Sequence, residues 1–390
     1  MKILITTDWY MPVVNGVVTS VMNLANGLRE MGHEVRILTL SETRHSHVDE
    51  NVTYIGAARA GVIYPDARLQ MARAAHYMDA LIRWRPDVVH SQCEFSTFHL
   101  ALRIATACGV PLVHTYHTIY EDYTHYFSPS VRVGKAVVAR LSRHVLNRTD
   151  AVIVPSEKTR SLLTSYGVRV PITVVPTGIS LERYSAPIAP ERLAALRSAL
   201  DLSEGDRVLL VLGRLAKEKS IDRLFHMLAA EKEAYKLVVV GDGPEHRALE
   251  ALATQLGMRA RVRFTGMVSP EETPVYYHLA DVFISASQSE TQGLTYMEAM
   301  ASGLPLLCAD DRAISDLIHH GVNGLLYRDN AGFHTGLAAL FAGAERRRAI
   351  GRAAQMTALS RYSIEAFVGR VLGVYQSTLQ EARAAAFCLV

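Results

Sequence analysis

The sequence is poor in cysteine and has no long apolar run. Its four cysteines, Cys93, Cys108, Cys308 and Cys388, are scattered, which argues against a disulfide framework or a cysteine-based zinc site and favours a reduced, cytosolic setting. No stretch approaches the roughly 18 apolar residues that a membrane-spanning helix needs. The first apolar run ends at Asp8, too early for the hydrophobic core of a signal peptide.

The net charge is also small. The 41 basic and 38 acidic side chains leave a charge of +3, so the overall charge indicates no partner, and no nucleic-acid recognition motif accompanies the basic residues. Hydrophobic residues at 49% and charged residues at 20% are values of globular proteins and argue against extended disorder. The length of 390 residues suits two domains of ordinary size.

Short apolar, β-branched runs alternate with longer helical patterns, which predicts βαβ units and parallel sheets. In the first half, the predicted strands are Lys2–Thr6, Glu34–Leu40, Val52–Ile55, Asp87–His90, Pro111–His114, Ala151–Pro155 and Ile172–Val175. In the second half, they are Arg207–Leu212, Lys236–Val240, Arg261–Thr265, Asp281–Ser285, Leu304–Ala309 and Gly324–Tyr327. Helices are predicted between them, including one over Ala67–Arg85.

A turn-rich segment separates the two series. Pro176–Ser180, followed by Pro187 and Pro190, predicts an interdomain linker. A last helical pattern begins at Ser363, and no strand follows it, so we predict that it crosses back onto the first domain. The predicted domains are residues 1–176 together with about 363–385, and residues 177–362.

A polar loop after the strand Asp281–Ser285 leads into a helix. Gly293 interrupts the loop, and Leu294, Met297 and Ala301 then recur at helical spacing. The positive end of a helix dipole and open backbone amides attract anions. A diphosphate is therefore expected at the amides of Thr291, Gln292, Gly293 and Leu294.

Two carboxylates bracket this helix start. Glu290 lies in the loop and can hydrogen-bond sugar hydroxyls on one side of a bound diphosphate, whereas Glu298 lies on the helix and can reach a ribose on the other. Their separation across the helix start disfavours a paired general acid and base. One capping and one exposed acid on an ordinary helix is the alternative that this stretch alone leaves open.

Ligands of open parallel sheets bind beyond the carboxyl ends of the strands. Arg214 and Lys219 follow the first strand of the second domain and can neutralise the charge that develops on a diphosphate leaving group. Asn15 and Gly16 follow the first strand of the chain, where the glycine amide can approach a phosphate closely. A solvated basic turn and an ordinary strand-to-helix turn remain the alternatives.

Two further strand ends carry unusual residues. Gly241–Pro244 resembles the start of a dinucleotide-binding motif, but His246 replaces the third glycine, so a tight turn is the favoured interpretation. His117 can contact a sugar hydroxyl or the reaction centre, although a lone histidine is more often structural. Glu94 can bind an acceptor hydroxyl or cap a helix.

A basic helical pattern runs from Val131 to about Asn147. On a helical wheel, one face carries four cations, Arg132, Lys135, Arg140 and Arg143. The opposite face carries the apolar residues Val133, Val137, Val138, Leu141 and Val145. Such a helix covers a sheet with its apolar side or attaches to anionic lipid, where each cation near the surface contributes about 1 kcal/mol.

Taken in order, these motifs are similar to those of the retaining GT-B glycosyltransferases of family four, over nearly the whole chain. The matching residues are Asn15-Gly16, Gly32–Val35, His117-Thr118, Val175–Ile179, Gly213-Arg214 with Lys219, Gly241–Pro244, Glu290 with Glu298, and Gly303–Pro305. The resemblance implies an α/β fold of two Rossmann-like, doubly wound domains facing across a cleft, with the C-terminal helix crossing back to the first.

The same resemblance implies roles for particular residues. The implied catalytic residues are His117, near the anomeric carbon, Arg214 and Lys219 at the diphosphate, and Glu290 at the donor sugar. The implied donor-binding residues are Gly16, Thr291, Gln292, Gly293, Leu294 and, at the ribose, Glu298. No metal or other cofactor is expected, consistent with the absence of an Asp-x-Asp motif. Asn15 departs from the family, where a second glycine is common.

Within the family, Gln92–Phe95 and His114–Tyr126 look most like bacterial 1,2-diacylglycerol 3-glucosyltransferases. This implies transfer of glucose from UDP-glucose to diacylglycerol or a glycolipid by a protein attached peripherally to the cytoplasmic face of the cell membrane. The expected acceptor contacts are Glu94, Tyr120 and Asp122, and the expected membrane contacts are Arg132, Lys135, Arg140 and Arg143. A soluble acceptor and a non-catalytic nucleotide-sugar-binding module are the alternatives.

Overall fold

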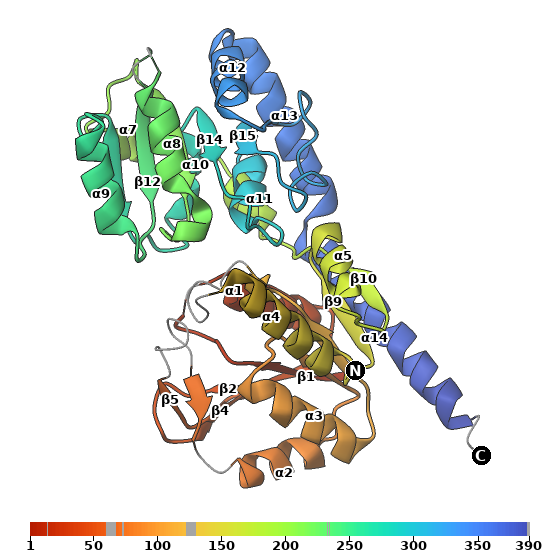
Figure 1. Ribbon diagram of the computed structural model, residues 1–390. Helices are drawn as coiled ribbons and strands as arrows, with labels where there is room; N and C mark the ends of the chain where they lie inside the picture. Colours follow the sequence, from red (N-terminus) through yellow and green to blue (C-terminus); the bar gives the residue numbers. More distant parts are fainter. Residues whose placement is uncertain are drawn as a thin grey trace. The chain divides into compact units, whose positions relative to one another are not determined.

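The chain divides into two compact units (Figure 1). The computed structural model describes residues 1–13, 15–59, 68–71, 74–121, 130–231, 233 and 235–387. The first unit comprises Met1–Gly178 together with Ile364–Val390, and the second comprises Ile179–Ser363. The sequence-based boundaries, at 176/177 and 362/363, lie within two residues of these.

The first unit is built on an eight-stranded sheet in the order β10-β9-β8-β7-β1-β2-β4-β3, in which β3 alone pairs antiparallel. Its strands are β1 (Lys2–Thr7), β2 (Glu34–Leu40), β3 (His47–Asp49), β4 (Val52–Ile55), β7 (Val88–Ser91), β8 (Leu112–Thr115), β9 (Ala151–Val154) and β10 (Ile172–Val174). Its helices are α1 (Gly16–Glu30), α2 (Ala75–Trp84), α3 (Ser96–Cys108), α4 (Val131–Leu146), α5 (Glu157–Ser165) and α14 (Ile364–Phe387).

Both faces of this sheet are covered. Successive side chains of a strand point to opposite faces, so Ile3 and Ile5 of β1 join one core cluster, whereas Leu4 between them joins the other. Helices α1 and α14 supply the first cluster, and α2 and α3 contribute to the second. Burial on both faces explains the nearly continuous apolar runs from which the strands were predicted.

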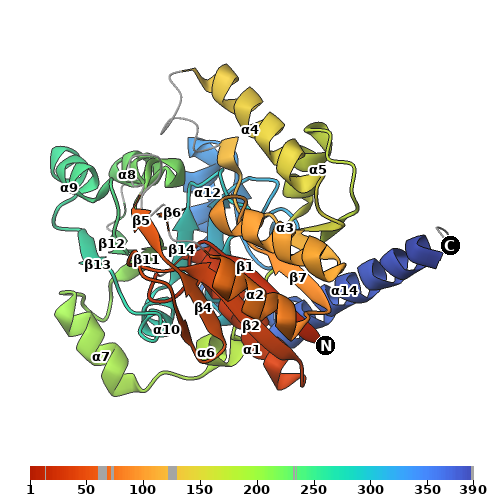
Figure 2. The same ribbon diagram turned by 90° about the horizontal axis from the view of Figure 1, so that it is seen from below.

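The C-terminal helix α14 packs against α1, as predicted (Figures 1 and 2). Val368 and Tyr375 of α14 are fully buried in the cluster that contains Val21 and Leu24 of α1. Gly27 of α1 allows the close approach, because a β-carbon there would lie only 2.6 Å from Val368 Cγ2. The first unit is therefore completed by the end of the chain.

The second unit contains a six-stranded parallel sheet in the order β13-β12-β11-β14-β15-β16. Its strands are β11 (Arg207–Leu212), β12 (Tyr235–Val240), β13 (Val262–Gly266), β14 (Val282–Ser285), β15 (Leu306–Ala309) and β16 (Leu325–Tyr327). Its helices are α6 (Leu181–Ser185), α7 (Pro190–Ala199), the 3-10 helix Lys217–Lys219, α8 (Ile221–Ala229), α9 (His246–Gln255), α10 (Thr273–Leu279), α11 (Leu294–Ala301), α12 (Asn330–Phe341) and α13 (Ala344–Arg361).

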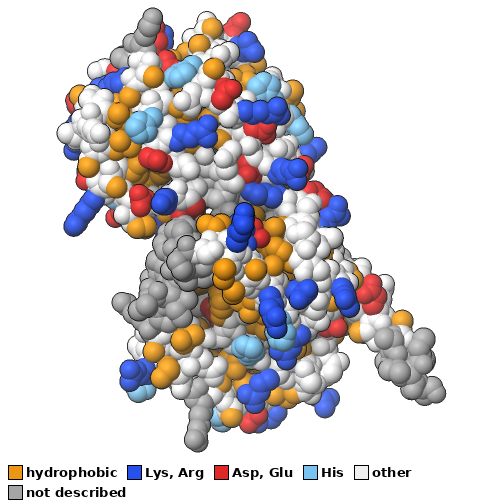
Figure 3. Space-filling view, in the orientation of Figure 1, with side chains coloured by type: hydrophobic (Ala, Val, Ile, Leu, Met, Phe, Trp, Pro, Cys, Tyr) orange, Lys and Arg blue, Asp and Glu red, His pale blue; other side chains and the backbone are white. Residues whose placement is uncertain are grey.

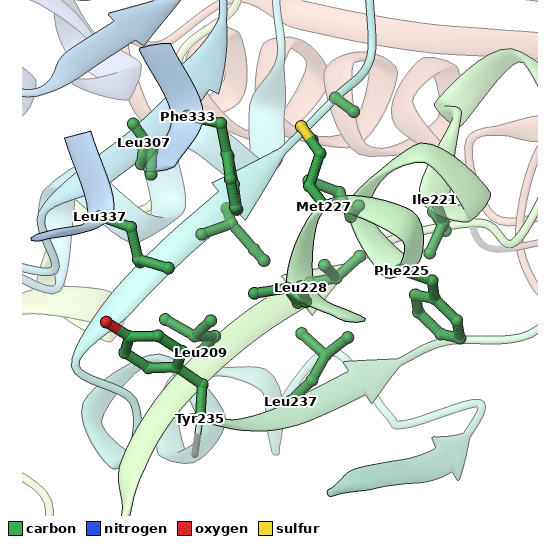
Figure 4. Packing of buried hydrophobic residues seen from close by; sticks show 14 of the residues in the cluster. Leu209, Ile221, Phe225, Met227, Leu228, Tyr235, Leu237, Leu307, Phe333 and Leu337 are labelled. Carbon is green, nitrogen blue, oxygen red and sulfur yellow. The ribbon is translucent and has the colours of Figure 1, made fainter. Parts of the chain in front are cut away.

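This sheet is also covered on both faces. Leu209 packs with Phe225, Leu228 and Phe333 in one cluster (Figure 4), whereas its neighbours in β11 face the other cluster. Hydrophobic clusters on the two faces of the sheet thus fix the positions of its strands and of their carboxyl ends. The loop that carries Thr291, Gln292 and Gly293 follows β14 at this edge of the sheet.

Some predicted elements are wrong. The helix predicted over Ala67–Arg85 begins only at Ala75, because Arg68–Gln70 forms strand β6, which pairs antiparallel with β5 (Ala57–Arg59). Sequence patterns also missed β3, three exposed residues that pair with β4. The short helix α6 lies within the predicted linker, between Ser180 and Pro187, and buries Leu181 in the second unit. Pairing with a neighbouring strand, rather than the propensity of each three-residue segment alone, determines β3, β5 and β6.

Candidate functional site

The loop before α11 ends as predicted, with Gly293 directly ahead of the helix. Gly293 has φ 82°, in the left-handed region, and a β-carbon there would lie 2.8 Å from the Tyr296 ring. Among the described residues, no side chain caps this helix end. The amide of Leu294 begins the helix, so an anion at this point would meet the positive end of its dipole.

Glu290 and Lys219 are brought together although 71 positions separate them. The Lys219 Nζ atom lies 2.7 Å from Glu290 Oε1, and the lysine side chain is 29% exposed against 11% for the glutamate. Lys219 ends the 3-10 helix, and the Ser289 hydroxyl donates to the backbone oxygen of Glu218, which ties the two loops together. One predicted sugar-binding residue and one predicted diphosphate-binding residue thus form an ion pair.

Arg214 lies in the loop that follows β11, and the backbone of this loop packs against the backbone of the loop that follows β12. The amide of Leu215 donates to the Asp242 oxygen at 3.0 Å, and a β-carbon on Gly243 would lie 2.4 Å from the Leu215 oxygen. A β-carbon on Gly241 would meet the Gly213 oxygen. The glycines of Gly241–Pro244 therefore serve close loop packing, consistent with the tight turn favoured from sequence.

Glu298 is held by tyrosines. The Tyr277 hydroxyl of α10 donates to Glu298 Oε2 at 2.7 Å, and Tyr184 of α6 also hydrogen-bonds this carboxyl group. Burial raises the pKa of Glu298, and the two phenols oppose that rise. The two tyrosines orient the carboxyl group that was predicted to contact the ribose. Neither was singled out from sequence, because α6 and α10 meet α11 only in the folded chain.

In the first unit, Asn15 is the N-cap of α1. Its Oδ1 atom accepts from the Val18 amide at 2.9 Å, and Gly16 occupies the first position of the helix. Asn15, where a glycine is common in the resembled family, therefore has a structural consequence. Its side chain satisfies the Val18 amide, which a glycine at this position would leave without a side-chain partner. Gly16 is placed at a helix start, where a glycine amide was predicted.

His117 lies beyond β8 and is joined to Gln92, beyond β7. Its Nε2 atom lies 2.6 Å from Gln92 Oε1. Burial and, to a lesser degree, His114 lower the pKa of His117 to about 3, so the ring is neutral at physiological pH. His117 is therefore suited to hydrogen bonding with a substrate hydroxyl and not to carrying charge.

Glu94 does not cap α3. Its Oε2 atom accepts from the Tyr120 hydroxyl at 2.6 Å, and its Oε1 atom lies 3.3 Å from His114 Nε2. The N-terminal end of α3 is instead held by Asp8, whose Oδ1 atom accepts from the Thr97 amide at 2.8 Å. Two predicted acceptor residues, Glu94 and Tyr120, thus lie together.

Asp122, the third predicted acceptor residue, lies outside the described residues. Asp8 was not predicted as part of this site. It follows β1 at the same edge of the sheet as Glu94, and burial raises its pKa to about 6, with the nearby Glu94 adding to the rise. The sequence could have indicated Asp8 as a site residue, because it lies just after a predicted strand, where ligands of parallel sheets bind.

Helix α4 differs from the predicted two-faced helix. Val138 and Val145 are buried, whereas Val133, Val137 and Leu141 are 59%, 53% and 46% exposed. The single apolar face predicted opposite the cations is therefore split, because the sheet covers only part of it.

The exposed part of α4 combines apolar and basic side chains. We call Val133, Val137 and Leu141, which lie four positions apart, the exposed apolar stripe. Arg132, Arg140 and Arg143 are exposed beside it, and Figure 3 shows Lys and Arg next to hydrophobic side chains over this helix. Lys135 forms an ion pair with Glu121, with 2.9 Å between Nζ and Oε2.

The two units thus offer different chemistry. The second presents cations, backbone amides at a helix start and two oriented carboxyl groups, which suit a nucleoside diphosphate bearing a sugar. The first presents a neutral histidine and a hydrogen-bonded glutamate, which suit hydroxyl groups. Among the described residues, no three His, Cys, Asp or Glu side chains gather in a way that would hold a metal ion.

Comparison with known proteins identifies the family. A sequence model described as Glycosyltransferase Family 4 matches residues 14–183, and one described as Glycosyl transferases group 1 matches residues 194–357. An alpha-monoglucosyldiacylglycerol synthase of Streptococcus pneumoniae is 38% identical over 331 residues, which cover 84% of this chain and 75% of that protein. The chain belongs to glycosyltransferase family 4. A synthase of the same name from Acholeplasma laidlawii is 32% identical over 344 residues, 85% of either chain.

Solved structures show the fold of this glycosyltransferase. Anabaena HepE in complex with UDP and glucose has a TM-score of 0.77 at 19% identity, covering 97% of this chain and 100% of that chain. Sucrose-phosphate synthase from Thermosynechococcus elongatus also has a TM-score of 0.77 at 19% identity, covering 97% and 99%. The fold is GT-B, with two Rossmann-like α/β domains, as predicted.

The glycosyltransferase carries no spanning helix in its described ranges, because none of the helices there combines the length and the apolar character that crossing a bilayer requires.

Proposed function

We propose that this glycosyltransferase moves glucose from UDP-glucose to diacylglycerol, or to a glycolipid, at a membrane surface and with retention at the anomeric carbon. The observation that carries the proposal is the exposed apolar stripe of α4 with its neighbouring cations, in a chain 38% identical to a monoglucosyldiacylglycerol synthase. The name of that relative supports both glucose and a diacylglycerol lipid as the groups that are joined.

The second unit supports a nucleotide-sugar donor. Arg214 and Lys219 would offset the charge of the leaving diphosphate, with the helix dipole of α11 adding to their effect. Glu290 would orient the sugar, and Glu298, held by Tyr277, would bind the ribose. Retention is proposed through attack on the face that the leaving group vacates, with the diphosphate accepting the proton of the acceptor hydroxyl.

The first unit supports a membrane acceptor. An apolar stripe flanked by Arg132, Arg140 and Arg143 resembles interfacial helices, which bury apolar side chains at the headgroup boundary and place cations against anionic lipid. Three cations at about 1 kcal/mol each are sufficient for reversible attachment when apolar burial adds to them. Peripheral attachment at the cytoplasmic face is proposed on this basis.

The test uses purified protein and liposomes of anionic phospholipid with diacylglycerol. UDP-glucose is expected to yield a glucosyl lipid whose anomeric configuration, determined by NMR spectroscopy, equals that of the donor. The same assay with other UDP-hexoses tests the choice of sugar. The absence of a glycolipid product with every UDP-sugar would overturn the proposal.

Variants of α4 separate membrane attachment from chemistry. The pair Val137→Asp and Leu141→Asp is expected to abolish sedimentation with anionic liposomes, and Arg140→Ala to weaken it roughly fivefold. Met356→Asp is the matched control, since Met356 is a 72% exposed apolar residue of a helix in the second unit. Transfer to a soluble sugar without any liposome binding would favour the soluble-acceptor alternative.

A further inference from the structure

A chain of buried hydrogen bonds runs from the C-terminal helix to His117. The Tyr375 hydroxyl of α14 lies 2.6 Å from His90 Nδ1, and His90 Nε2 lies 3.1 Å from Gln92 Nε2. Gln92 Oε1 in turn lies 2.6 Å from His117 Nε2. Tyr375 and His90 are fully buried and Gln92 is 2% exposed, so water does not compete for the hydrogen bonds among these three residues.

Both histidines in the chain are neutral. Burial lowers the pKa of His90 well below its usual range, with smaller effects from His114 and His117 in the same direction. The pKa of His117 is lowered to about 3. A neutral imidazole has one N–H donor and one lone-pair acceptor, so the role of one ring nitrogen determines the role of the other.

The direction of the chain is determined at His90 Nε2. Thr115 Oγ1 lies 2.7 Å from this atom and Gln92 Nε2 lies 3.1 Å from it. The Gln92 amide nitrogen can only donate, so the His90 Nε2 atom beside it must accept, and the Thr115 hydroxyl can donate to the same lone pair. His90 therefore carries its hydrogen on Nδ1 and donates it to the Tyr375 oxygen, and Gln92 turns its amide nitrogen toward His90.

We propose that Tyr375, His90 and Gln92 are positioning residues that fix His117 in the tautomer with hydrogen on Nε2, so that Nδ1 is presented as a hydrogen-bond acceptor. Gln92 Oε1 can only accept, which requires His117 Nε2 to donate. Nδ1 then takes a substrate hydroxyl as its donor. A carboxylate or phosphate oxygen at the same point would be repelled, so this atom selects a neutral hydroxyl group.

The substrate contact rests on the proposed function, but the tautomer does not. Helix α14 then has a role beyond packing, because its Tyr375 supplies the acceptor at which the hydrogen-bond chain begins. Removing the Tyr375 oxygen leaves the His90 Nδ1 hydrogen buried without a partner, which is unfavourable. His90 would then move its hydrogen to Nε2, Gln92 would turn over, and His117 would carry hydrogen on Nδ1.

The tautomer is measured by ¹⁵N long-range correlation NMR on full-length protein labelled at histidine, with His117→Asn used for assignment. Free wild-type protein is expected to show His117 protonated at Nε2, and Tyr375→Phe to shift it toward Nδ1. Gln92→Leu is expected to give a mixture of tautomers. Tyr116→Phe is the control, because Tyr116 is a buried phenol of the same unit that takes no part in this hydrogen-bond chain. Its hydroxyl oxygen lies 3.2 Å from Ser142 Oγ.

Kinetics supply the second readout. In Tyr375→Phe and Gln92→Leu, kcat/KM with UDP-glucose is expected to fall roughly tenfold, the effect of one unsatisfied buried group. A wild-type His117 protonated at Nδ1, or a Tyr375→Phe protein with the wild-type tautomer, would overturn the inference. If the tautomers are as expected but no UDP-sugar is a substrate, the proposed function fails and the positioning chain stands.

Discussion

At the scale of single residues, the ion pair between Lys219 and Glu290 couples two groups that the proposed function assigns to different parts of the donor. The pair is largely buried, with 2.7 Å between Nζ and Oε1. A lysine held by a carboxylate is pre-oriented, and a diphosphate would compete with that carboxylate for it. Each residue therefore influences the other even if only one contacts the leaving group.

Lys219→Met is expected to lower kcat at least a hundredfold, because a cation that stabilises developing charge contributes about 3–4 kcal/mol. The measurement is UDP release from UDP-glucose in the presence of acceptor. Lys217→Met is the matched control, since Lys217 is an exposed lysine of the same 3-10 helix. Equal losses in the two variants would show that general charge in this helix, and not the position of Lys219, matters.

The Asp8→Asn substitution tests a buried carboxyl group of the first unit. Burial raises the pKa of Asp8 to about 6 from 3.8, so the folded state holds this proton more tightly than the unfolded state. The wild type therefore loses stability as pH rises from 3.8 through about 6, and asparagine, which keeps an oxygen for the Thr97 amide, removes this loss.

Relative to Asp8→Asn, the wild-type free energy of unfolding is expected to fall by about 2 kcal/mol between about pH 4.5 and pH 7. Urea denaturation of both proteins at several pH values measures the difference. A difference that does not change with pH would contradict the raised pKa of Asp8.

At the scale of elements, the contact between α1 and α14 depends on a glycine. Gly27→Ala places a methyl group within 2.6 Å of Val368 Cγ2 and 2.9 Å of Ile364 Cγ2. We expect a loss of about 1–3 kcal/mol in stability, as for other overpacked cores, measured by thermal or denaturant unfolding. The double variant with Val368→Ala is expected to recover part of this loss.

Gly369→Ala is the control for this prediction. Gly369 lies in the same helix as Val368, but a β-carbon there meets no atom within 4 Å. Alanine is expected to be neutral or to stabilise the helix by up to about 1 kcal/mol. If both glycine variants behaved alike, helix propensity and not the contact between α1 and α14 would explain the effect at Gly27.

At the scale of the whole molecule, transfer is expected to proceed without a divalent metal ion. Arg214, Lys219 and the positive end of α11 would together offset the diphosphate charge that a metal offsets in other enzymes. The rate of UDP-glucose turnover with EDTA is therefore predicted to equal the rate with magnesium. A rate restored only by added metal after chelation would contradict this prediction.

The sequence by itself determined most of the strands and helices in their order, the GT-B resemblance and the helix start at Gly293. These depend on local patterns: apolar runs for strands buried on both faces, helical spacing, and a glycine at positive φ. The tyrosines that hold Glu298 and the hydrogen-bond chain from Tyr375 to His117 were decided only by the tertiary structure. Their partners are far apart in sequence, and no local pattern records which distant side chains meet in a folded core.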